Sequence, residues 1–326
     1  MPYESSVDAA VDLITFEAVQ WAASVIGLPP TPAWSYPVLD ALVGTTVVVK
    51  HENVQPTGAF KVRGGLTLLA GLTEADKAAG LVTASTGNHA QSVAYAAGRG
   101  GVRAVIVAPE TSPAGKLDAV RALGAEVVVH GPTMTEALAL AHRLADEQGL
   151  RYVDPGNEPA IVLGHATVYL ELFRQRPDLT AVYVPIGSGS GAAGACVVRD
   201  VMAPDCRVIG VQSAAAPAAH DSWTTGSLQT RPCTTRMSGL ATGRGFALPQ
   251  QVLRGRLDGF VLVTDDAIDD ARRLLASRAH TLAEGAGAAA LAGVLADESK
   301  PADPIAVVCT GGNADDQELA TLVAPG

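Results

Sequence analysis

Hydrophobic positions early in the chain recur with a helical period and then give way to a β-branched run. Between residues 7 and 26, apolar side chains fall three or four positions apart, which predicts one amphipathic helix (Val7, Ala10, Val11, Ile14, Ala18, Trp21, Ala22, Val25). Three prolines after this stretch end the helix and begin a loop (Pro29, Pro30, Pro32). The run from Thr46 to Lys50 predicts a strand, and a helix is expected over residues 62 to 72.

From residue 81 onward, short apolar runs alternate with amphipathic stretches. The runs predict strands at residues 81–85, 102–108, 126–130, 151–153, 181–186, 207–212 and 305–309. The stretches predict helices at residues 89–97, 112–124, 133–149, 158–175, from 190 onward, and at 266–278, 284–297 and 314–323. Ser112 and Thr133 are expected to cap their helices, whereas residues 214–262 show no clear pattern. Such alternation predicts an α/β fold with mainly parallel sheets covered by helices on both faces.

Composition narrows the function classes. The chain has 326 residues, of which 48% are hydrophobic and only 17% charged, as expected for a globular enzyme with a large core. A net charge of −10 without a Lys/Arg cluster argues against nucleic-acid binding. No apolar run is long enough to span a membrane, and no signal peptide is visible. The four cysteines fall in no CxxC or zinc spacing, so we expect reduced thiols in a cytoplasmic protein (Cys196, Cys206, Cys233, Cys309).

One lysine lies in a glycine-rich segment between the strand at residues 46–50 and the next helix. The segment runs from Gln55 to Gly65 and places Phe60 directly before Lys61. An aromatic ring can cover a planar ligand, and a lysine amine shielded from water can form a Schiff base with an aldehyde. Taken alone, a solvated lysine after a turn is the commoner interpretation. The other loops of the chain favour the interpretation that Lys61 forms a Schiff base.

Three further loops follow strands and open helices or turns. The first, from Ser85 to His89, combines hydroxyls with the free N–H groups of a helix start and can bind a carboxylate, while Asn88 can donate to a phenolate-like oxygen. The second, from Gly187 to Gly191, can surround a phosphate. In the third, Thr310 to Asn313, the threonine hydroxyl can meet a ring nitrogen. Ordinary caps and turns are the alternatives. Ligands gather at such strand ends in open α/β sheets.

Motifs of other enzyme classes are incomplete in this sequence. Gly189, Gly191 and Gly194 match a dinucleotide-binding spacing, but the acidic residue needed about 20 positions later is Gln212. The histidines show no HExxH spacing, and no Gly-x-Ser-x-Gly elbow is completed around Ser188 or Ser190.

Together these segments resemble the fold-type II pyridoxal-phosphate enzymes, above all the threonine/serine dehydratases and serine racemases. The resemblance covers residues from about 30 to the end, and rests on Gln55–Gly64, Ala84–Gln91, Pro185–Gly194 and Cys309–Asn313. It implies a two-lobed α/β architecture like that of the tryptophan synthase β subunit, with a large domain of residues 1–53 and 155–326 and a small domain of residues 54–154. It also implies pyridoxal 5′-phosphate as cofactor and a homodimer.

The resemblance assigns roles to individual residues. Lys61 becomes the Schiff-base lysine and catalytic base, with Thr86 as a second catalytic residue. The implied cofactor-binding residues are Phe60, Lys61, Asn88, Gly187, Ser188, Gly189, Ser190, Gly239 and Thr310. The implied substrate-binding residues are Ser85, Thr86 and His89.

The chain departs from these relatives at several positions. Thr86 replaces the usual alanine or serine, His165 replaces glutamine, and Ser188 and Ser190 interrupt a glycine run. Gln212 and Ala218 replace the two carboxylates of the serine racemase cation site, so we expect no metal (Gln212, Ala218).

The expected activity is a lyase that deaminates a small β-hydroxy amino acid of the threonine or serine type. An amino-acid racemase or a β- or γ-replacement synthase on the same fold is the alternative. A noncatalytic amino-acid or nucleotide-binding protein represents a different class.

Overall fold

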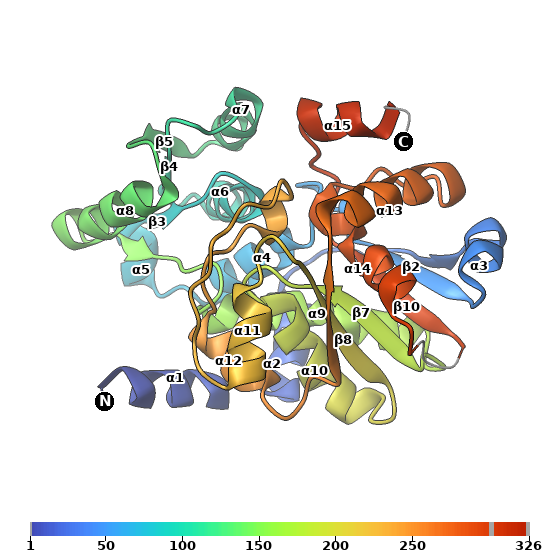
Figure 1. Ribbon diagram of the computed structural model, residues 1–326. Helices are drawn as coiled ribbons and strands as arrows, with labels where there is room; N and C mark the ends of the chain where they lie inside the picture. Colours follow the sequence, from blue (N-terminus) through green and yellow to red (C-terminus); the bar gives the residue numbers. More distant parts are fainter. Residues whose placement is uncertain (1, 300–302, 324–326) are drawn as a thin grey trace.

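Two separate β-sheets organise the molecule, as the computed structural model in Figure 1 shows for residues 2–299 and 303–323. The larger sheet has six strands in the order β1-β2-β10-β7-β8-β9, and only β1 runs antiparallel to its neighbour. Its strands are β1 Ala33–Ser35, β2 Val47–His51, β7 Ala181–Pro185, β8 Arg207–Ser213, β9 Gly259–Val263 and β10 Ile305–Cys309. The smaller sheet is parallel, in the order β5-β4-β3-β6, with β3 Leu81–Ala84, β4 Ala104–Ala108, β5 Glu126–Val129 and β6 Arg151–Tyr152.

Helices cover both sheets. The α-helices are α1 Pro2–Asp12, α2 Phe16–Val25, α3 Pro37–Val43, α4 Lys61–Gly71, α5 Glu74–Ala79, α6 Asn88–Gly100, α7 Ala114–Ala122, α8 Met134–Gln148, α9 Pro159–Gln175, α10 Ser190–Met202, α11 Ala218–Thr225, α12 Ala247–Leu253, α13 Asp265–Arg278, α14 Gly285–Ala296 and α15 Asp316–Val323. Two 3₁₀ turns are η1 Glu52–Val54 and η2 Ser238–Leu240. Among the described residues, none of these helices has the length and apolarity that a membrane crossing requires.

Alternate residues of the central strands pack on opposite faces, which explains why these strands read as continuous apolar runs. In β2, Val48 joins the core formed with α2, α9 and α10, whereas Val47 and Val49 join the core formed with α3, α13 and α14. The smaller sheet is built alike, with α4, α6 and α7 on one face and α8 on the other. The predicted α/β fold with mainly parallel sheets is therefore confirmed.

Two local predictions were wrong. The stretch from 7 to 26 is two helices, because Thr15 caps the second one by accepting a hydrogen bond from the Ala18 N–H at 3.1 Å. Ser112 does not cap α7, since its hydroxyl instead donates to the Pro109 carbonyl at 2.6 Å. Thr133 does cap α8, in a capping box with Glu136.

Several elements were missed by the sequence patterns. The strand β1 and helix α3 lie in the proline-rich stretch, and the short α5 has no buried residue to produce a periodic signal. The region 214–262 contains α11, η2, α12 and β9. Its strand β9 lies at a sheet edge and is mostly half-buried, which weakens the alternation.

A buried network of charges joins the segments that surround α4. The Arg63 guanidinium donates to both carboxylate oxygens of Glu52 (2.7 and 2.8 Å) and to both of Glu171 (2.7 and 2.8 Å). Lys50 adds a bond of 2.9 Å to Glu171. Burial raises the pKa of Glu52, but the charge of Arg63 outweighs that effect and the pKa is lowered. Lys50, Glu52 and Arg63 are fully inaccessible to solvent, so each charge depends on its partners.

Removing one member of this network is expected to destabilise the fold strongly. In Arg63→Leu, Glu171 would keep its bond to Lys50 but Glu52 would lose the cation to which it is bonded, and unpaired buried charges of this kind cost about 3–5 kcal/mol. Arg103→Leu is the matched control, because the Arg103–Glu126 pair is about half exposed and should contribute less than about 1 kcal/mol. Urea unfolding of both variants measures the difference. Equal midpoints for the two variants would contradict the expectation.

Candidate active site

The four loops singled out in the sequence meet at the carboxyl ends of the strands. The Phe60 N–H donates to the Thr310 carbonyl at 2.9 Å, and the Gly312 N–H donates to the Gly58 carbonyl at 2.9 Å. The Asn313 amide donates to the Asn88 side-chain oxygen at 2.8 Å, which connects the end of β10 to the start of α6. The loop after β7 completes the group, because Gly191 lies against the Phe60 ring.

Lys61 begins α4, a helix that packs against both α6 and α9 (Figure 1). Its amine is 5.0 Å from the centroid of the Phe60 ring. Burial lowers the pKa of Lys61 to about 8, and the nearby Glu284 carboxylate opposes part of that shift. The amine can therefore lose its proton close to neutral pH, as a nucleophile or base requires.

Asn88 is held by two neighbours in a defined orientation. Its side-chain nitrogen donates to Glu284 at 2.5 Å while its oxygen accepts from Asn313. Glu284 is only 3% exposed, and burial together with the charge of Glu318 raises the pKa of Glu284 to about 7. The second proton of the Asn88 amide remains able to donate to a ligand.

Glu284 was missed by the sequence reasoning, where it marked only the start of a helix. A signal was present, because it directly precedes α14, a helix made almost entirely of alanine and glycine and buried over nearly its whole length. An acidic residue beside such a segment is itself buried unless it reaches solvent, and buried carboxylates concentrate at functional sites.

The glycine-rich loop after β7 is shaped to receive an anion. Gly189 has a φ of +91°, and a Cβ on Gly187 would lie 2.6 Å from the Gly239 carbonyl oxygen, so this close approach requires glycine. The free N–H groups of the 13-residue helix α10 follow directly. The hydroxyls of Ser188 and Ser190 lie 3.2 Å apart at the same helix start. Such a set of donors fits a phosphate group.

Thr310 and the neighbouring Gly311 close the site from the β10 side. Thr310 is buried, and its carbonyl is bonded to the segment that carries Lys61. A Cβ on Gly287 would lie 2.2 Å from the Gly311 carbonyl oxygen, so the close approach of α14 to the segment after β10 requires glycine at residue 287.

The loop after β3 holds the predicted substrate-binding residues. Ser85 accepts a hydrogen bond from the Gly87 N–H at 3.3 Å. Thr86 is half-buried, and its hydroxyl forms no hydrogen bond with any residue that the structure describes. His89 is turned toward the smaller sheet, with Nε2 3.2 Å from the Thr83 hydroxyl. Burial, and then the charge of Lys61, lower the pKa of His89 to about 4, so its ring is neutral.

Gln212 and Ala218, the two positions where the sequence led us to expect no cation ligand, lie at the end of β8 and at the start of α11. The Gln212 side-chain oxygen accepts from the His220 N–H at 3.0 Å, and Ala218 begins α11. Within residues 2–299 and 303–323, no three His, Cys, Asp or Glu side chains are grouped as a metal site would require.

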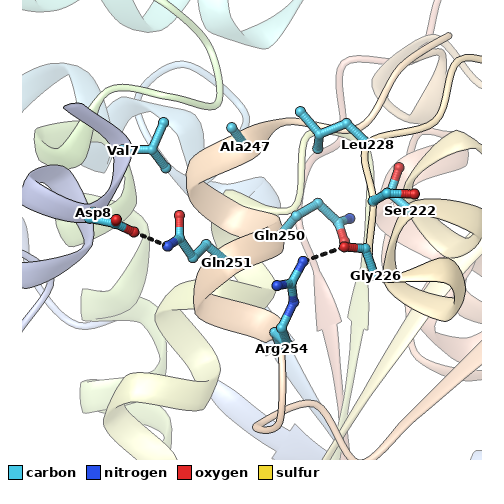
Figure 2. A pocket seen from close by; sticks show the side chains of 10 residues that line it. Val7, Asp8, Ser222, Gly226, Leu228, Ala247, Gln250, Gln251 and Arg254 are labelled. Atoms are coloured by element: carbon cyan, nitrogen blue, oxygen red, sulfur yellow. Dashed lines mark hydrogen bonds between the residues drawn. The ribbon is translucent and has the colours of Figure 1, made fainter. Parts of the chain in front are cut away.

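A surface cavity of about 440 Å³ lies elsewhere, between α1, α11 and α12 (Figure 2). Asp8 and Gln251 are bonded to each other across it, and Arg254 is bonded to the Gly226 carbonyl. None of the predicted site residues lines this cavity. The candidate active site is therefore identified by the reactive and polar side chains at the carboxyl ends of the strands, and not by the size of a cavity.

Glu284→Gln is expected to change how stability depends on pH. Because the pKa of Glu284 is raised from 4.5 to about 7 in the folded protein, its stabilising contribution is complete below pH 4.5 and is lost as the pH rises through 7. Glutamine can still accept from Asn88 but does not ionise. We therefore expect the variant to gain up to about 3 kcal/mol relative to wild type between about pH 5 and pH 8.5. Urea unfolding at both pH values measures the gain, and parallel pH profiles would contradict it.

Known proteins share this arrangement over most of the chain. The L-threonine ammonia-lyase of Thermotoga maritima is 35% identical over 89% of this chain and 72% of its own length. Among solved structures, maize serine racemase superimposes with a TM-score of 0.89 at 29% identity, covering 94% of this chain and 95% of that one. The processed form of threonine deaminase isoform 2 from Solanum lycopersicum superimposes with a TM-score of 0.88 at 30% identity, covering 94% and 92%.

The expected fold-type II architecture is confirmed by these superpositions. The buried lysine, the anion-binding glycine loop and the oriented amide are groups that pyridoxal phosphate needs, and the profile of the pyridoxal-phosphate dependent enzymes matches residues 26–311. The cofactor expected from the sequence is confirmed in the same way, and the chain belongs to the family of pyridoxal-phosphate dependent enzymes.

Proposed function

We propose that this chain is an ammonia-lyase that removes water and ammonia from threonine or serine and leaves a 2-oxo acid. The observation that carries the proposal is Lys61, an amine with a lowered pKa placed beside an aromatic ring in a chain 35% identical to an L-threonine ammonia-lyase. Pyridoxal phosphate, when bound, supplies an electron sink for the charge that develops at the substrate Cα.

The proposed cofactor-binding residues lie on the loops that contact one another at the strand ends. Phe60 would cover a face of the cofactor ring, Asn88 would donate to the ring hydroxyl, and Thr310 would lie near the ring nitrogen. The phosphate would be held by four consecutive residues, Gly187, Ser188, Gly189 and Ser190. The backbone of Gly239 would lie beside the ring. The fixed orientation of the Asn88 amide and the close approach of Gly187 to Gly239 support this assignment.

The proposed catalytic steps use few protein groups. Ser85, Thr86 and the first N–H groups of α6 bind the substrate carboxylate, with His89 beneath them. Lys61 removes the Cα proton. A hydroxyl at Thr310, unlike a carboxylate, does not favour protonation of the ring nitrogen, which suits prompt loss of the β-hydroxyl. The released enamine becomes an imine, and water converts that imine to the 2-oxo acid and ammonia.

A racemase is the second candidate, favoured by the superposition on maize serine racemase. Racemisation needs a proton donor on the face of Cα opposite Lys61. In the racemase alternative, the Thr86 hydroxyl would be that donor. The β-replacement alternative begins with the same removal of the Cα proton.

The proposal also covers the division into domains, the oligomeric state and the cellular compartment. Residues 54–154 would form a small domain around the four-stranded sheet, and residues 1–53 and 155–326 a large one. Trp34, Val54 and Leu282 are about half exposed around a cavity of about 280 Å³, an apolar surface that suits a homodimer. The four free cysteines suit a reducing cytoplasm. Light scattering on the purified chain tests the dimer.

Lys61→Ala is expected to abolish turnover and covalent cofactor attachment, because it removes the proposed nucleophilic amine. Borohydride treatment of the loaded wild-type protein followed by peptide mass mapping should place the label on Lys61. Lys116→Ala is the matched control, since Lys116 contacts Asp315 and Ser238 and is not assigned to the chemistry. Label on Lys50 or Lys116 would end the assignment.

Thr86 is expected to set the ratio of elimination to racemisation. The extra methyl of threonine restricts its rotamers, so Thr86→Ser should raise any racemase side activity several-fold, while Thr86→Ala should leave elimination largely intact. Chiral chromatography beside 2-oxo acid assays, with L-serine and L-threonine, measures both products. Mainly D-amino acid from the wild type would replace the lyase by the racemase.

A further inference from the structure

The side chains of a histidine and a serine from two different helices meet beside the glycine-rich loop. His165 lies on α9 and Ser190 begins α10, 25 residues apart in the chain. The His165 Nδ1 atom is 2.9 Å from the Ser190 hydroxyl, and both side chains are buried, at 0% and 1% exposure. The histidine and the serine therefore form one unit at the proposed phosphate site.

The surroundings of His165 fix its ring in place. Its ring centroid lies 4.4 Å from that of Phe60, and an added Cβ on Gly64 would lie 2.9 Å from Nε2. Nε2 is buried and has no hydrogen-bond partner among the residues that the structure describes. The Phe60 ring on one side and the hydrogen bond with the Ser190 hydroxyl hold the His165 ring with its Nδ1 atom directed at Ser190.

The hydroxyl of Ser190 has a single proton to share among its neighbours. It contacts His165 Nδ1 and, at 3.2 Å, the Ser188 hydroxyl, and it stands at the open start of α10. A phosphate dianion has only acceptor oxygens, so Ser190 must direct its proton to that group when the group is bound. Its other two contacts must then be donors to Ser190.

We propose that His165 is a positioning residue for the cofactor phosphate, held as the neutral tautomer with its proton on Nδ1 so that Ser190 can donate to the phosphate. This inference rests on the proposed phosphate site at residues 187–190. His165 acts through Ser190 and does not contact the cofactor phosphate itself.

The charges around His165 support a neutral ring. Burial lowers the pKa of His165 well below its usual value, and the charges of Lys61 and Arg63 act in the same direction. The backbone of Lys61 opposes part of that shift. With one proton on the ring, the choice lies between Nδ1 and Nε2. The phosphate settles that choice in favour of Nδ1, which leaves the partnerless Nε2 as an acceptor.

Nitrogen-15 NMR of histidine-labelled full-length holoenzyme reads the tautomer directly. We expect one neutral histidine with its proton on Nδ1, whose signal is absent from the spectrum of His165→Gln. A proton on Nε2, or on both nitrogens, in the pyridoxal-phosphate-loaded protein would overturn the inference.

Cofactor affinity gives an independent readout. His165→Phe keeps a ring against Phe60 but removes the donor, so the Kd for pyridoxal phosphate should rise about tenfold, as expected for one lost hydrogen bond. Ser190→Ala should cause a similar loss, and the double variant no more than either single one. His165→Gln retains an N–H donor and should stay within about threefold of wild type. His130→Gln, an exposed histidine, is the matched control.

Pyridoxal without its phosphate separates this role from a general packing effect. His165→Phe should leave pyridoxal binding unchanged within about twofold, because only the phosphate needs the Ser190 proton. Equal losses for both ligands, no loss for either, or fully additive losses in the double variant would each overturn the inference. A wild-type chain that binds neither ligand would instead overturn the proposed function.

Discussion

The buried charge network around Arg63 is the constraint on which the site depends. Arg63 lies two residues after Lys61 on α4 and is fixed by carboxylates from η1 and α9. Because charges without solvent must keep their partners, the first turn of α4 cannot shift or rotate without a large cost. The network therefore sets the position from which the Lys61 amine enters the site.

One carboxylate, that of Glu284, acts on both the charge of Lys61 and the orientation of Asn88. Glu284 raises the pKa of Lys61 against the effect of burial, and it also orients Asn88. Its own pKa lies near 7, so its charge and that of Lys61 change over neighbouring pH ranges. Such coupled groups titrate as a pair, and the site can hold or release a proton near neutral pH without exposing charge to solvent.

Sequence patterns predicted the strands and the loops that follow them, because apolar runs and glycine-serine-threonine clusters are local signals. They could not predict contacts between distant segments, such as Asn88 with Glu284 or His165 with Ser190. The Ser112 cap failed because a nearby carbonyl of Pro109 competed for its hydroxyl. The helix over 7–26 failed because Thr15 caps a second helix inside one periodic pattern. The assigned roles of the site residues remain predictions.

The contact between Asn88 and Glu284 joins two parts of the molecule that otherwise have separate sheets. Asn88 and the loop after β3 belong to the four-stranded sheet, whereas the glycine-rich loop, Thr310 and Glu284 belong with the six-stranded sheet. If the smaller sheet were displaced from the larger one, this hydrogen bond would break, whereas the glycine-rich loop would keep its close approach to Gly239 within the larger part. The orientation of the Asn88 amide therefore depends on how the two sheets are placed relative to each other, but the shape of the glycine-rich loop does not.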